Sequence, residues 1–447
     1  MSHRMRDAIT RRGVAHGSPD TPCPARTRVW PTGPSRATLK SMSGTQILST
    51  HTPSGVTLQP GWRVPDYSGD NVANLMMSLA LGLSDDRRPA SPDCPHLDHL
   101  PPEAVRGHRH VLLMVIDGLG DAMLNGRAPC PTLRGCRALS LSSVFPSTTA
   151  AGITCFLTGQ PPARHGLTGW HMYLESLDTV MAVLPGHPRG DGPAYTDLDI
   201  TPRELLGLDP LFEHLAVPVN CVSPAAIADS PFNRSMTRAA RSHVYEDLEG
   251  FFQGTRRAVL GSPGFTYAYW PDLDRLGHLH GADSAELRAH LGALDAGFAQ
   301  LLERLSGSDT LVLLTADHGM IDAPLRLDLD AHPDITACLR HPLCGEPRVA
   351  FAYVRPGLHE RFRELVNARF GYCLTLADSR ELLNAGWFGP GPAHPALSGR
   401  VGDYALLMHD GWMVFDRVPE EGPRRMVAVH GGLSATERLV PLVAVRV

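Results

Sequence analysis

The stretches HVLLMVID (residues 110–117) and TLVLLTAD (residues 310–317) decide the fold, because each is a continuous apolar run that ends in an aspartate. Runs of leucine and β-branched residues without polar alternation are typical of parallel strands that are buried on both faces. Three further segments have the same strand-like character: FTYAYW (265–270), VAFAYV (349–354) and YALLMH (404–409). The chain therefore contains the strands of a large, well-buried sheet.

A clear helical pattern lies between these strands. Residues 284–305 repeat leucine and phenylalanine at helical spacing, and Asp283 with Glu286 resembles a capping box at the start of the helix. Strands that alternate with helices predict an α/β fold, with a doubly wound, mostly parallel sheet that is flanked by helices. We expect this domain to span residues 51–447, with a small inserted α+β lid subdomain over residues 320–400.

The composition argues against several classes of protein. The chain has 447 residues, of which 43% are hydrophobic and 19% are charged, and its formal net charge is −5. These values are typical of a globular protein and argue against a nucleic-acid partner, which would favour a strongly basic surface. The apolar runs are far shorter than the roughly 20 residues that cross a bilayer, so we expect no membrane span. The sequence does not indicate an oligomeric state.

Two further features concern the cellular location and the N-terminus. The nine cysteines are irregularly spaced and form no CxxC pair, which favours a reducing, cytoplasmic location. Residues 1–50 are rich in arginine, poor in acids and without apolar periodicity. We expect a disordered leader there.

The polar residues that follow the apolar runs are the first candidates for a functional site, because ligands of open α/β sheets bind beyond the carboxyl ends of the strands. Asp117 closes the first run, and Asp317-His318 closes the second. Asp274 and His278 stand four positions apart, and a metal pair at this spacing requires a tight loop or a helical turn, which would place both on one face of the helix. Carboxylate oxygen and imidazole nitrogen are ligands that Zn²⁺ takes.

Two more segments carry candidate residues. In FPSTTAAGITCFLTG (145–159), Thr149 would begin a short helix that stops at Gly159, and free N–H groups at a helix N-terminus favour an anion. His430 precedes two glycines. Taken singly, each candidate also has an ordinary explanation as a turn aspartate, a surface Asp-His pair, a helix-capping threonine or a loop histidine.

Taken together, the motifs resemble the alkaline-phosphatase superfamily, and within it the nucleotide pyrophosphatase/phosphodiesterase family (type I phosphodiesterases). The family's motifs follow a fixed order. First comes a strand-ending Asp, and then a Pro-x-x-Thr nucleophile that is followed by a Thr-Gly. Next come an Asp-x-x-Gly-His, in which Asp and His are four positions apart, an Asp-His-Gly and a late His-Gly. The matching residues here are Asp117, Pro146 with Thr149, Thr158-Gly159, Asp274 with Gly277-His278, Asp317-His318-Gly319 and His430-Gly431. The resemblance covers about residues 110–440 and implies an alkaline-phosphatase-like fold.

The resemblance implies two zinc ions. One would be bound by Asp274, His278 and His430, and the other by Asp117, Asp317, His318 and the side-chain oxygen of Thr149. Nine positions separate Thr149 from Thr158, which is the family's spacing between the nucleophile and the Thr-Gly. Thr149 rather than its neighbour Thr148 is therefore the expected nucleophile.

The implied activity is that of a metal-dependent hydrolase, which cleaves phosphodiester or pyrophosphate bonds of nucleotide-type substrates through a phosphothreonine intermediate. Its partner would be a small-molecule phosphate ester or nucleotide. Two alternatives stay open. One is a phosphomonoesterase or phosphonate hydrolase on the same scaffold, and the other is a non-catalytic metal-binding protein.

Particular side chains bear on these alternatives. A phosphate monoester carries one more charge than a diester and needs a fixed cation, for which the candidates are Arg164, Arg275 and Arg326. A nucleotide substrate would favour aromatic side chains around its base, for which the candidates are Trp170, Tyr173 and Trp270, although each is equally compatible with a place in the core.

Overall fold

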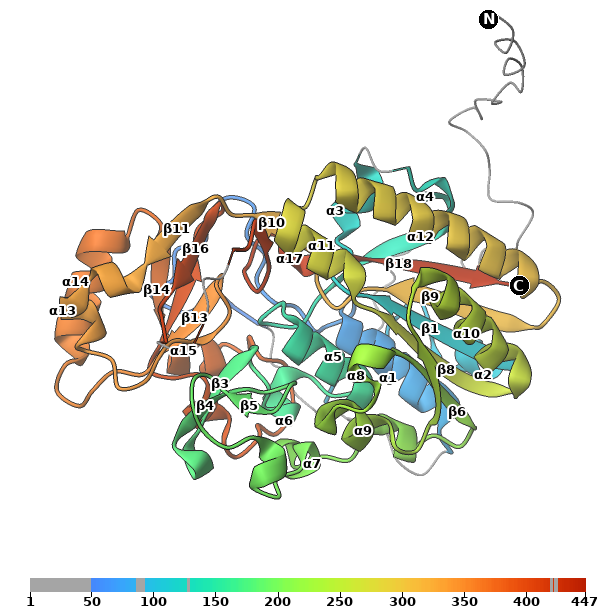
Figure 1. Cartoon of the computed structure of the whole chain (residues 1–447), viewed down its shortest axis with the longest axis horizontal. Helices are drawn as coiled ribbons and strands as arrows, with labels where there is room; N and C mark the ends of the chain where they lie inside the picture. The colour runs from blue at the N-terminus through green and yellow to red at the C-terminus, as the bar shows by residue number, and fades with distance from the viewer. Residues whose placement is uncertain (1–49, 86–92, 127–128, 419–420, 422–424) are drawn as a thin grey trace, which may run out of the picture.

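The computed structural model describes residues 50–447, apart from 86–92, 127–128, 419–420 and 422–424 (Figure 1). The disordered leader expected over residues 1–50 therefore lies, except for its last residue, outside the described residues. Of the helices in the described part of the chain, none combines the length and the hydropathy that crossing a bilayer requires.

A seven-stranded, mostly parallel sheet forms the centre of the molecule (Figure 1). In spatial order its strands are β2 (Arg137–Ser142), β18 (Leu439–Arg446), β9 (Thr310–Thr315), β1 (His110–Ile116), β8 (Gly264–Trp270), β6 (Val219–Pro224) and β7 (Arg241–Tyr245). Only β18 runs antiparallel to its neighbours. The two apolar runs that end in aspartate are thus parallel strands of this sheet, as the sequence predicts, and the structure shows that they are adjacent.

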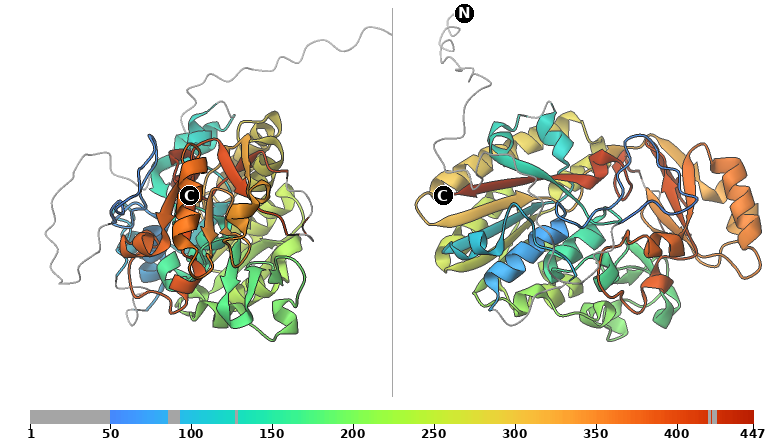
Figure 2. Two further views of the ribbon diagram at one scale, coloured as in Figure 1. Left: turned by 90° about the vertical axis from the view of Figure 1, so that its left-hand side faces the viewer. Right: turned by 180° about the vertical axis from the view of Figure 1, so that it is seen from behind.

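The central strands are buried because helices cover both faces of the sheet. All seven residues of β1 are buried. Helices α10 (Leu248–Gly261) and α12 (Ala285–Arg304) lie on one face, and α1 (Val72–Leu83) and α5 (Thr149–Thr158) lie on the other (Figures 1 and 2). This is the doubly wound α/β architecture that alternating strands and helices predict.

The start of α12 differs from the expected capping box. Ser284 is the N-cap residue, and its side chain accepts a hydrogen bond from the Leu287 N–H group. Asp283 lies one residue earlier and forms an ion pair with Arg288 at 2.8 Å. The hydroxyl of Ser284 satisfies the same kind of free N–H group. The helix therefore begins where the periodicity predicts, although its N-cap residue is Ser284.

A second, wholly antiparallel sheet lies beside the carboxyl ends of the central strands (Figure 1). Its strands are, in order, β14 (Leu374–Asp378), β15 (Tyr404–Met408), β13 (Val349–Ala352), β12 (Cys344–Gly345), β3 (His171–Leu174), β4 (Thr179–Ala182) and β5 (His187–Pro188). The strands expected within 349–354 and 404–409 belong here. They read like central strands because separate apolar clusters cover both faces of this sheet.

The second sheet draws on more of the chain than residues 320–400. Strands β3 to β5 precede that range and β15 follows it. The lid over 320–400 stays a prediction, and we call the whole second sheet with helix α14 (His359–Phe370) the cap. Two small pairs complete the strands: β10 (Ile321–Asp322) with β17 (Ala428–Val429), and β11 (Leu325–Asp328) with β16 (Trp412–Phe415).

Shorter helices connect these parts. They are α2 (Pro102–Arg106), α3 (Asp121–Asn125), α4 (Pro131–Cys136), α6 (Pro162–His165), α7 (Pro202–Leu206), α8 (Ala225–Ala228), α9 (Pro231–Thr237), α11 (Asp272–His280), α13 (Pro333–Thr336), α15 (Ser379–Asn384), α16 (Leu397–Arg400) and α17 (Ala435–Arg438). Of these, α11 follows β8 directly, and α17 leads into the last strand.

Candidate active site

Three neighbouring strands deliver acidic side chains to one edge of the central sheet. Asp117 follows β1, Asp317 follows β9, and α11 follows β8 and carries Asp274. Residues Val115 and Thr315 are paired, as are Ile116 and Trp270, so the three strands end level with one another. The parallel register therefore brings together acids that are far apart in the sequence.

A glycine turn allows the acids to approach closely. Gly118 has a φ of +75°, which residues with a side chain rarely adopt. A Cβ atom at this position would lie 3.0 Å from both Cα and Cβ of Asp274. The chain can thus turn sharply after Asp117 only because residue 118 has no side chain.

One group of possible metal ligands consists of Asp117, Asp317 and His318. Each offers a ligand atom, and these atoms all lie within 4.8 Å of one another. Nε2 of His318 lies 3.3 Å from Oδ1 of Asp117 and 3.6 Å from Oδ2 of Asp317. These are the three residues, besides Thr149, that the resemblance assigns to one zinc ion.

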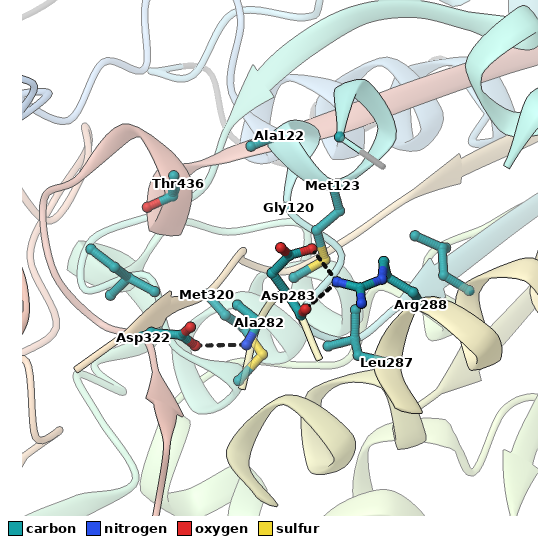
Figure 3. Close-up of a pocket in the computed structure, with 13 residues that line it drawn as sticks. Gly120, Ala122, Met123, Ala282, Asp283, Leu287, Arg288, Met320, Asp322 and Thr436 are labelled. Carbon is teal, nitrogen blue, oxygen red and sulfur yellow. Dashed lines mark hydrogen bonds and ion pairs between the residues drawn. The ribbon is translucent and has the colours of Figure 1, made fainter. Parts of the chain in front are cut away.

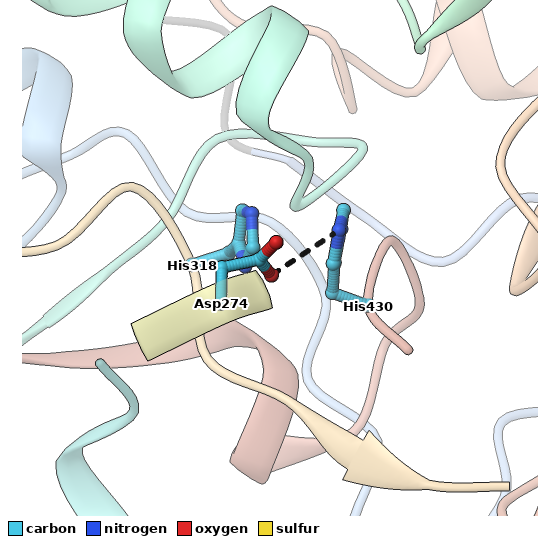
Figure 4. Close-up of side chains that lie close together, drawn as sticks. All are labelled: Asp274, His318 and His430. Carbon is cyan, nitrogen blue, oxygen red and sulfur yellow. Dashed lines mark ion pairs between the residues drawn. The ribbon is translucent and has the colours of Figure 1, made fainter. Parts of the chain in front are cut away.

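A second group consists of Asp274, His318 and His430, which face one another in Figure 4. The expected set has His278 in place of His318. Nε2 of His278 lies 3.1 Å from Oδ2 of Asp274, and Nε2 of His430 lies 3.7 Å from Oδ1 of the same carboxylate. The three predicted carboxylates and three predicted histidines thus lie together, and His318 belongs to both groups.

The three histidines present the same nitrogen to the site. Nδ1 of His318 lies 3.0 Å from the Gly319 carbonyl oxygen, that of His278 lies 2.8 Å from the Ala428 carbonyl, and that of His430 lies 3.3 Å from the Ser147 carbonyl. A carbonyl oxygen accepts a proton from Nδ1 and leaves the lone pair on Nε2. This arrangement orients a histidine for metal binding.

The carboxylates complete a site that fits divalent cations. Oδ1 of Asp117, Oδ1 of Asp274 and Oδ2 of Asp317 are buried and have no hydrogen-bond partner in the described part of the chain. Such atoms are costly unless an ion or a donor satisfies them. Three carboxylate oxygens and three Nε2 atoms in one buried space are a donor set for Zn²⁺.

The pKa values of these groups reflect burial and mutual repulsion. Burial raises the pKa of Asp117, and the charges of Asp317 and Asp274 raise it further. Burial likewise raises the pKa of Asp317. Burial alone would lower the pKa of His278, but the Asp274 carboxylate raises it to about 9. Burial lowers the pKa of His430. A buried excess of carboxylates of this kind favours a bound cation.

Thr149 begins α5 and faces these groups. Its Oγ1 lies 3.1 Å from Nε2 of His318. Because the first N–H groups of a helix have no partner within the helix, the start of α5 offers donors to an anion beside the Thr149 hydroxyl. Gly159, with a φ of 68°, ends the helix as the sequence predicts.

The neighbouring threonine is placed differently. Thr148 is fully buried, and its hydroxyl donates a hydrogen bond to Oε1 of Glu346 in the cap. Thr149 is partly exposed. Of the two hydroxyls, only that of Thr149 borders an open cavity.

The cavity beside Thr149 has a volume of about 310 Å³. Its walls are largely apolar and include Ile153, Leu157, Trp170, Leu184 and Phe232. Tyr267 is one of the lining residues, and its buried hydroxyl has no hydrogen-bond partner among the described residues. The described residues that line the cavity include no arginine, lysine or histidine.

Of the three aromatic candidates, only Trp170 lines this cavity. Tyr173 stacks on His341 within the cap, with 4.0 Å between ring centroids. Trp270 stacks on Tyr245, and its indole N–H donates to His290. The last two aromatics therefore have structural contacts of their own.

None of the three candidate arginines lines the cavity. Arg275 pairs with Asp272, and Arg164 donates to the Pro392 carbonyl. The guanidinium of Arg326 donates to the Met426 carbonyl.

Another cavity, of about 510 Å³, lies near the same sheet edge (Figure 3). Its lining includes Gly120, Met320, Asp322 and the ion pair of Asp283 with Arg288. None of the seven predicted site residues, all of which the structure describes, lines it. The cavity beside Thr149 is therefore the candidate substrate site.

Two further residues, Tyr269 and Glu346, contact the site, although the sequence alone did not point to them. Tyr269 donates its hydroxyl to Oδ2 of Asp117. Glu346 accepts hydrogen bonds from the Thr148 hydroxyl and from the backbone N–H group of Trp170. Tyr269 lies within a strand-like run, and its role is visible only from the sheet register. The acid Glu346 interrupts apolar sequence just before VAFAYV, and this was the one available signal.

Comparisons with known proteins give a family match for most of the chain. The family model for type I phosphodiesterases/nucleotide pyrophosphatases matches residues 111–433. Among curated protein sequences, none matches the chain.

Solved structures show the same fold. Murine ectonucleotide pyrophosphatase/phosphodiesterase 5 is 17% identical with a TM-score of 0.56, over 75% of this chain and 87% of that one. An inactive variant of that mouse protein has been solved in complex with AMP. Phosphonoacetate hydrolase from Sinorhizobium meliloti 1021, in complex with phosphonoformate, is 17% identical with a TM-score of 0.54, over 75% of this chain and 90% of that one.

Proposed function

Because the chain belongs to the type I phosphodiesterase/nucleotide pyrophosphatase family, and is thus an enzyme that acts on phosphorus esters, we propose that it hydrolyses phosphodiester or pyrophosphate bonds of nucleotide-type substrates. The reaction would pass through a phosphothreonine at Thr149. The observation that carries the proposal is the position of Thr149. Its hydroxyl lies at a helix N-terminus, 3.1 Å from His318, and borders an apolar cavity.

Two zinc ions fit the donor set. Asp274, His278 and His430 would hold one, and Asp117, Asp317 and His318 the other. Bound there, the ions would supply positive charge that stabilises the attacking and leaving oxygens and lowers the pKa of the Thr149 hydroxyl.

In the first step, Oγ1 of Thr149 attacks phosphorus. A new oxygen–phosphorus bond forms, the bond to the leaving oxygen breaks, and the hydroxyl proton is lost to solvent. The N–H groups at the start of α5 orient the phosphoryl oxygens, because they have no partner within the helix. In the second step, the oxygen of a water molecule replaces Oγ1 at phosphorus and regenerates the hydroxyl.

The cavity favours a substrate whose reacting phosphorus carries one negative charge. Its apolar walls suit an ester group or a base, and the neutral hydroxyl of Tyr267 can donate to that group. A monoester dianion, or a phosphonate that also bears a carboxylate, would bring an extra charge. Burial of an unpaired charge is costly, and no cationic side chain among the described lining residues compensates it.

We also propose a cytoplasmic location. Eight cysteines are present as buried free thiols in the described part of the chain. Thiols persist in reducing compartments, which supports this part of the proposal.

The test is a comparison of kcat/KM in the presence of zinc for three substrates. They are the p-nitrophenyl ester of thymidine monophosphate, p-nitrophenyl phosphate and phosphonoacetate. We expect the nucleotide ester to be cleaved best. A preference of tenfold or more for the monoester would replace the proposal by a phosphomonoesterase, and release of phosphate from phosphonoacetate as the main activity would replace it by a phosphonate hydrolase.

A further inference from the structure

Glu346 lies where the cap meets the nucleophile. It occupies the turn between β12 and β13, and only 9% of its surface is exposed. Its Oε1 accepts two hydrogen bonds, one from the Thr148 hydroxyl and one, at 2.8 Å, from the backbone N–H group of Trp170. The two donors adjoin the two functional elements of the site, since Thr148 precedes the nucleophile and Trp170 lines the cavity.

The contact with Thr148 determines how α5 begins. Thr148 is the N-cap residue of this helix, yet its side chain makes no capping hydrogen bond. The hydroxyl instead points to Glu346. A threonine at the N-cap position normally accepts a hydrogen bond from an N–H group of the first helical turn. Thr148 lacks this bond and instead contacts Glu346 of the second sheet. Fixing Thr148 also fixes the backbone from which Thr149 projects.

The same turn packs against the loop that carries His430. Gly431 has a φ of +112°, and a Cβ atom there would lie 2.9 Å from Cβ of Glu346. Ser147 and Gly431 form an antiparallel bridge, so the nucleophile loop and the histidine loop are directly paired.

Arg348, two residues after Glu346, strengthens this junction. Its guanidinium forms a bidentate ion pair with Glu437, with both distances 3.0 Å. Glu437 accepts a hydrogen bond from the Gly432 N–H group at 2.8 Å. The turn between β12 and β13 therefore has two attachments: Glu346 binds Thr148 next to the nucleophile, and Arg348 binds Glu437 in α17.

From these contacts we infer that Glu346 is a positioning residue, which couples the location of the Thr149 hydroxyl to the wall of the substrate cavity. The inference rests on the proposed function, because it concerns turnover at Thr149. Glu346 acts through Thr148 on the nucleophile and through Trp170 on the ester group. Loss of the first contact lowers kcat on every substrate, whereas loss of the second raises KM only for substrates that fill the cavity.

The experiment uses Glu346→Ala, Thr148→Val, their double variant, and the conservative variants Glu346→Gln and Thr148→Ser. Two diesters are compared: the p-nitrophenyl ester of thymidine monophosphate, and methyl p-nitrophenyl phosphate, which lacks a large ester group. Glu360→Ala, an exposed acid on α14, is the control for substitution in the cap. Zinc content and melting temperature are measured for each protein.

We expect Glu346→Ala and Thr148→Val to lower kcat on both substrates on the order of 100-fold, the scale expected for a displaced reacting group. The double variant should lose no more than the worse single variant, because both remove one interaction. Only Glu346→Ala should also raise KM, and only for the nucleotide ester. Glu346→Gln keeps an acceptor and Thr148→Ser keeps a donor, so each should retain most of the wild-type kcat.

Several results would overturn the inference. An active wild-type protein whose kcat is unchanged in Glu346→Ala and Thr148→Val excludes a positioning role but leaves the proposed function intact. Independent, additive losses in the double variant exclude the coupling. If Glu346→Ala fails to fold, Thr148→Val and Glu346→Gln decide the question through the same hydrogen bond. A wild-type protein that cleaves no phosphate ester contradicts the proposed function itself.

Discussion

Oγ1 of Thr149 and Nε2 of His318 lie 3.1 Å apart, although 169 positions separate them in the chain. The first begins a helix on one face of the central sheet, and the second follows strand β9. Their contact places a hydroxyl at the edge of a cluster of carboxylates and imidazoles. It also distinguishes Thr149 from Thr148, whose hydroxyl is bound to Glu346.

We predict that Thr149→Ala lowers turnover by several orders of magnitude, because it removes the attacking oxygen. Zinc content and melting temperature should stay close to those of the wild type. Thr148 variants should be milder, and the reverse order would mean that the nucleophile is one residue earlier. A chiral phosphate substrate should react with net retention, because each of two in-line displacements inverts phosphorus.

Metal removal should abolish activity. We expect purified protein to contain about two zinc ions per chain, because two-metal sites stabilise both oxygens of an in-line displacement. Dialysis against a chelator should remove the activity and lower the melting temperature, since three buried carboxylate oxygens then lose their cation. Elemental analysis with an activity assay before and after zinc is returned checks this. Undiminished turnover of metal-free protein would contradict the mechanism.

Gly152→Ala should damage the site despite lying in a helix. A Cβ atom at residue 152 would lie 2.7 Å from Cβ of Asp317, so α5 or Asp317 must move. In an open helical position the same change normally stabilises a protein by about 1 kcal/mol. Gly261→Ala in α10 is the matched control, because no atom lies within 4 Å of its added Cβ. We expect lower activity and melting temperature for Gly152→Ala alone, and equal behaviour of the two variants would contradict the close approach.

Tyr267→Phe should reveal whether the cavity binds the ester group through a hydrogen bond. The hydroxyl is buried in the cavity wall without a partner among the described residues. Its removal should raise KM for the nucleotide ester roughly three- to tenfold, the worth of one neutral hydrogen bond. Methyl p-nitrophenyl phosphate, which lacks the group, serves as the internal control. An equal effect on both substrates would place the hydroxyl near phosphorus instead.

Stability should fall in acid partly because of His165. This histidine is fully buried, and burial lowers its pKa from 6.5 to about 3. The unfolded chain therefore binds a proton that the folded chain does not, so the free energy of unfolding falls as pH drops below 6.5 towards 3. Between pH 7 and pH 5 this group should account for about 2 kcal/mol. Urea unfolding of wild type and His165→Asn checks it: the variant should lose less stability over this range, and parallel losses would contradict the assignment.

Much of the central architecture follows from local sequence. The runs that become β1 and β9 are apolar at nearly every position, and the residues after them are polar, so both the strands and their functional ends are recognisable. The helix over 285–304 follows from its leucine spacing. The spacing of Asp274 and His278 is compatible with a helical turn or a tight loop, and in the structure the helix α11 carries both.

What local sequence could not supply are the contacts between distant segments. VAFAYV and YALLMH have the composition of buried strands, but only the fold shows that they belong to the second sheet. Likewise, His318 lies between both ligand groups because three strands end level, which spacing within one segment cannot reveal. Glu346 contacts Thr148 across 198 positions, and no local pattern encodes this pairing.

The cap is formed by segments that are far apart in the sequence, and it is not a single continuous insertion. At the junction of its two halves, residue Gly345 pairs with His171, and a Cβ atom on Gly169 would lie 2.5 Å from Cα of Gly345. Two segments that both follow Thr149 in the chain, one shortly after it and one much later, thus meet backbone to backbone. A chimera that imports residues 344–352 from a relative without an acid at position 346 would leave Thr148 without its acceptor. New specificities in this scaffold should therefore be sought by exchanging the two segments together.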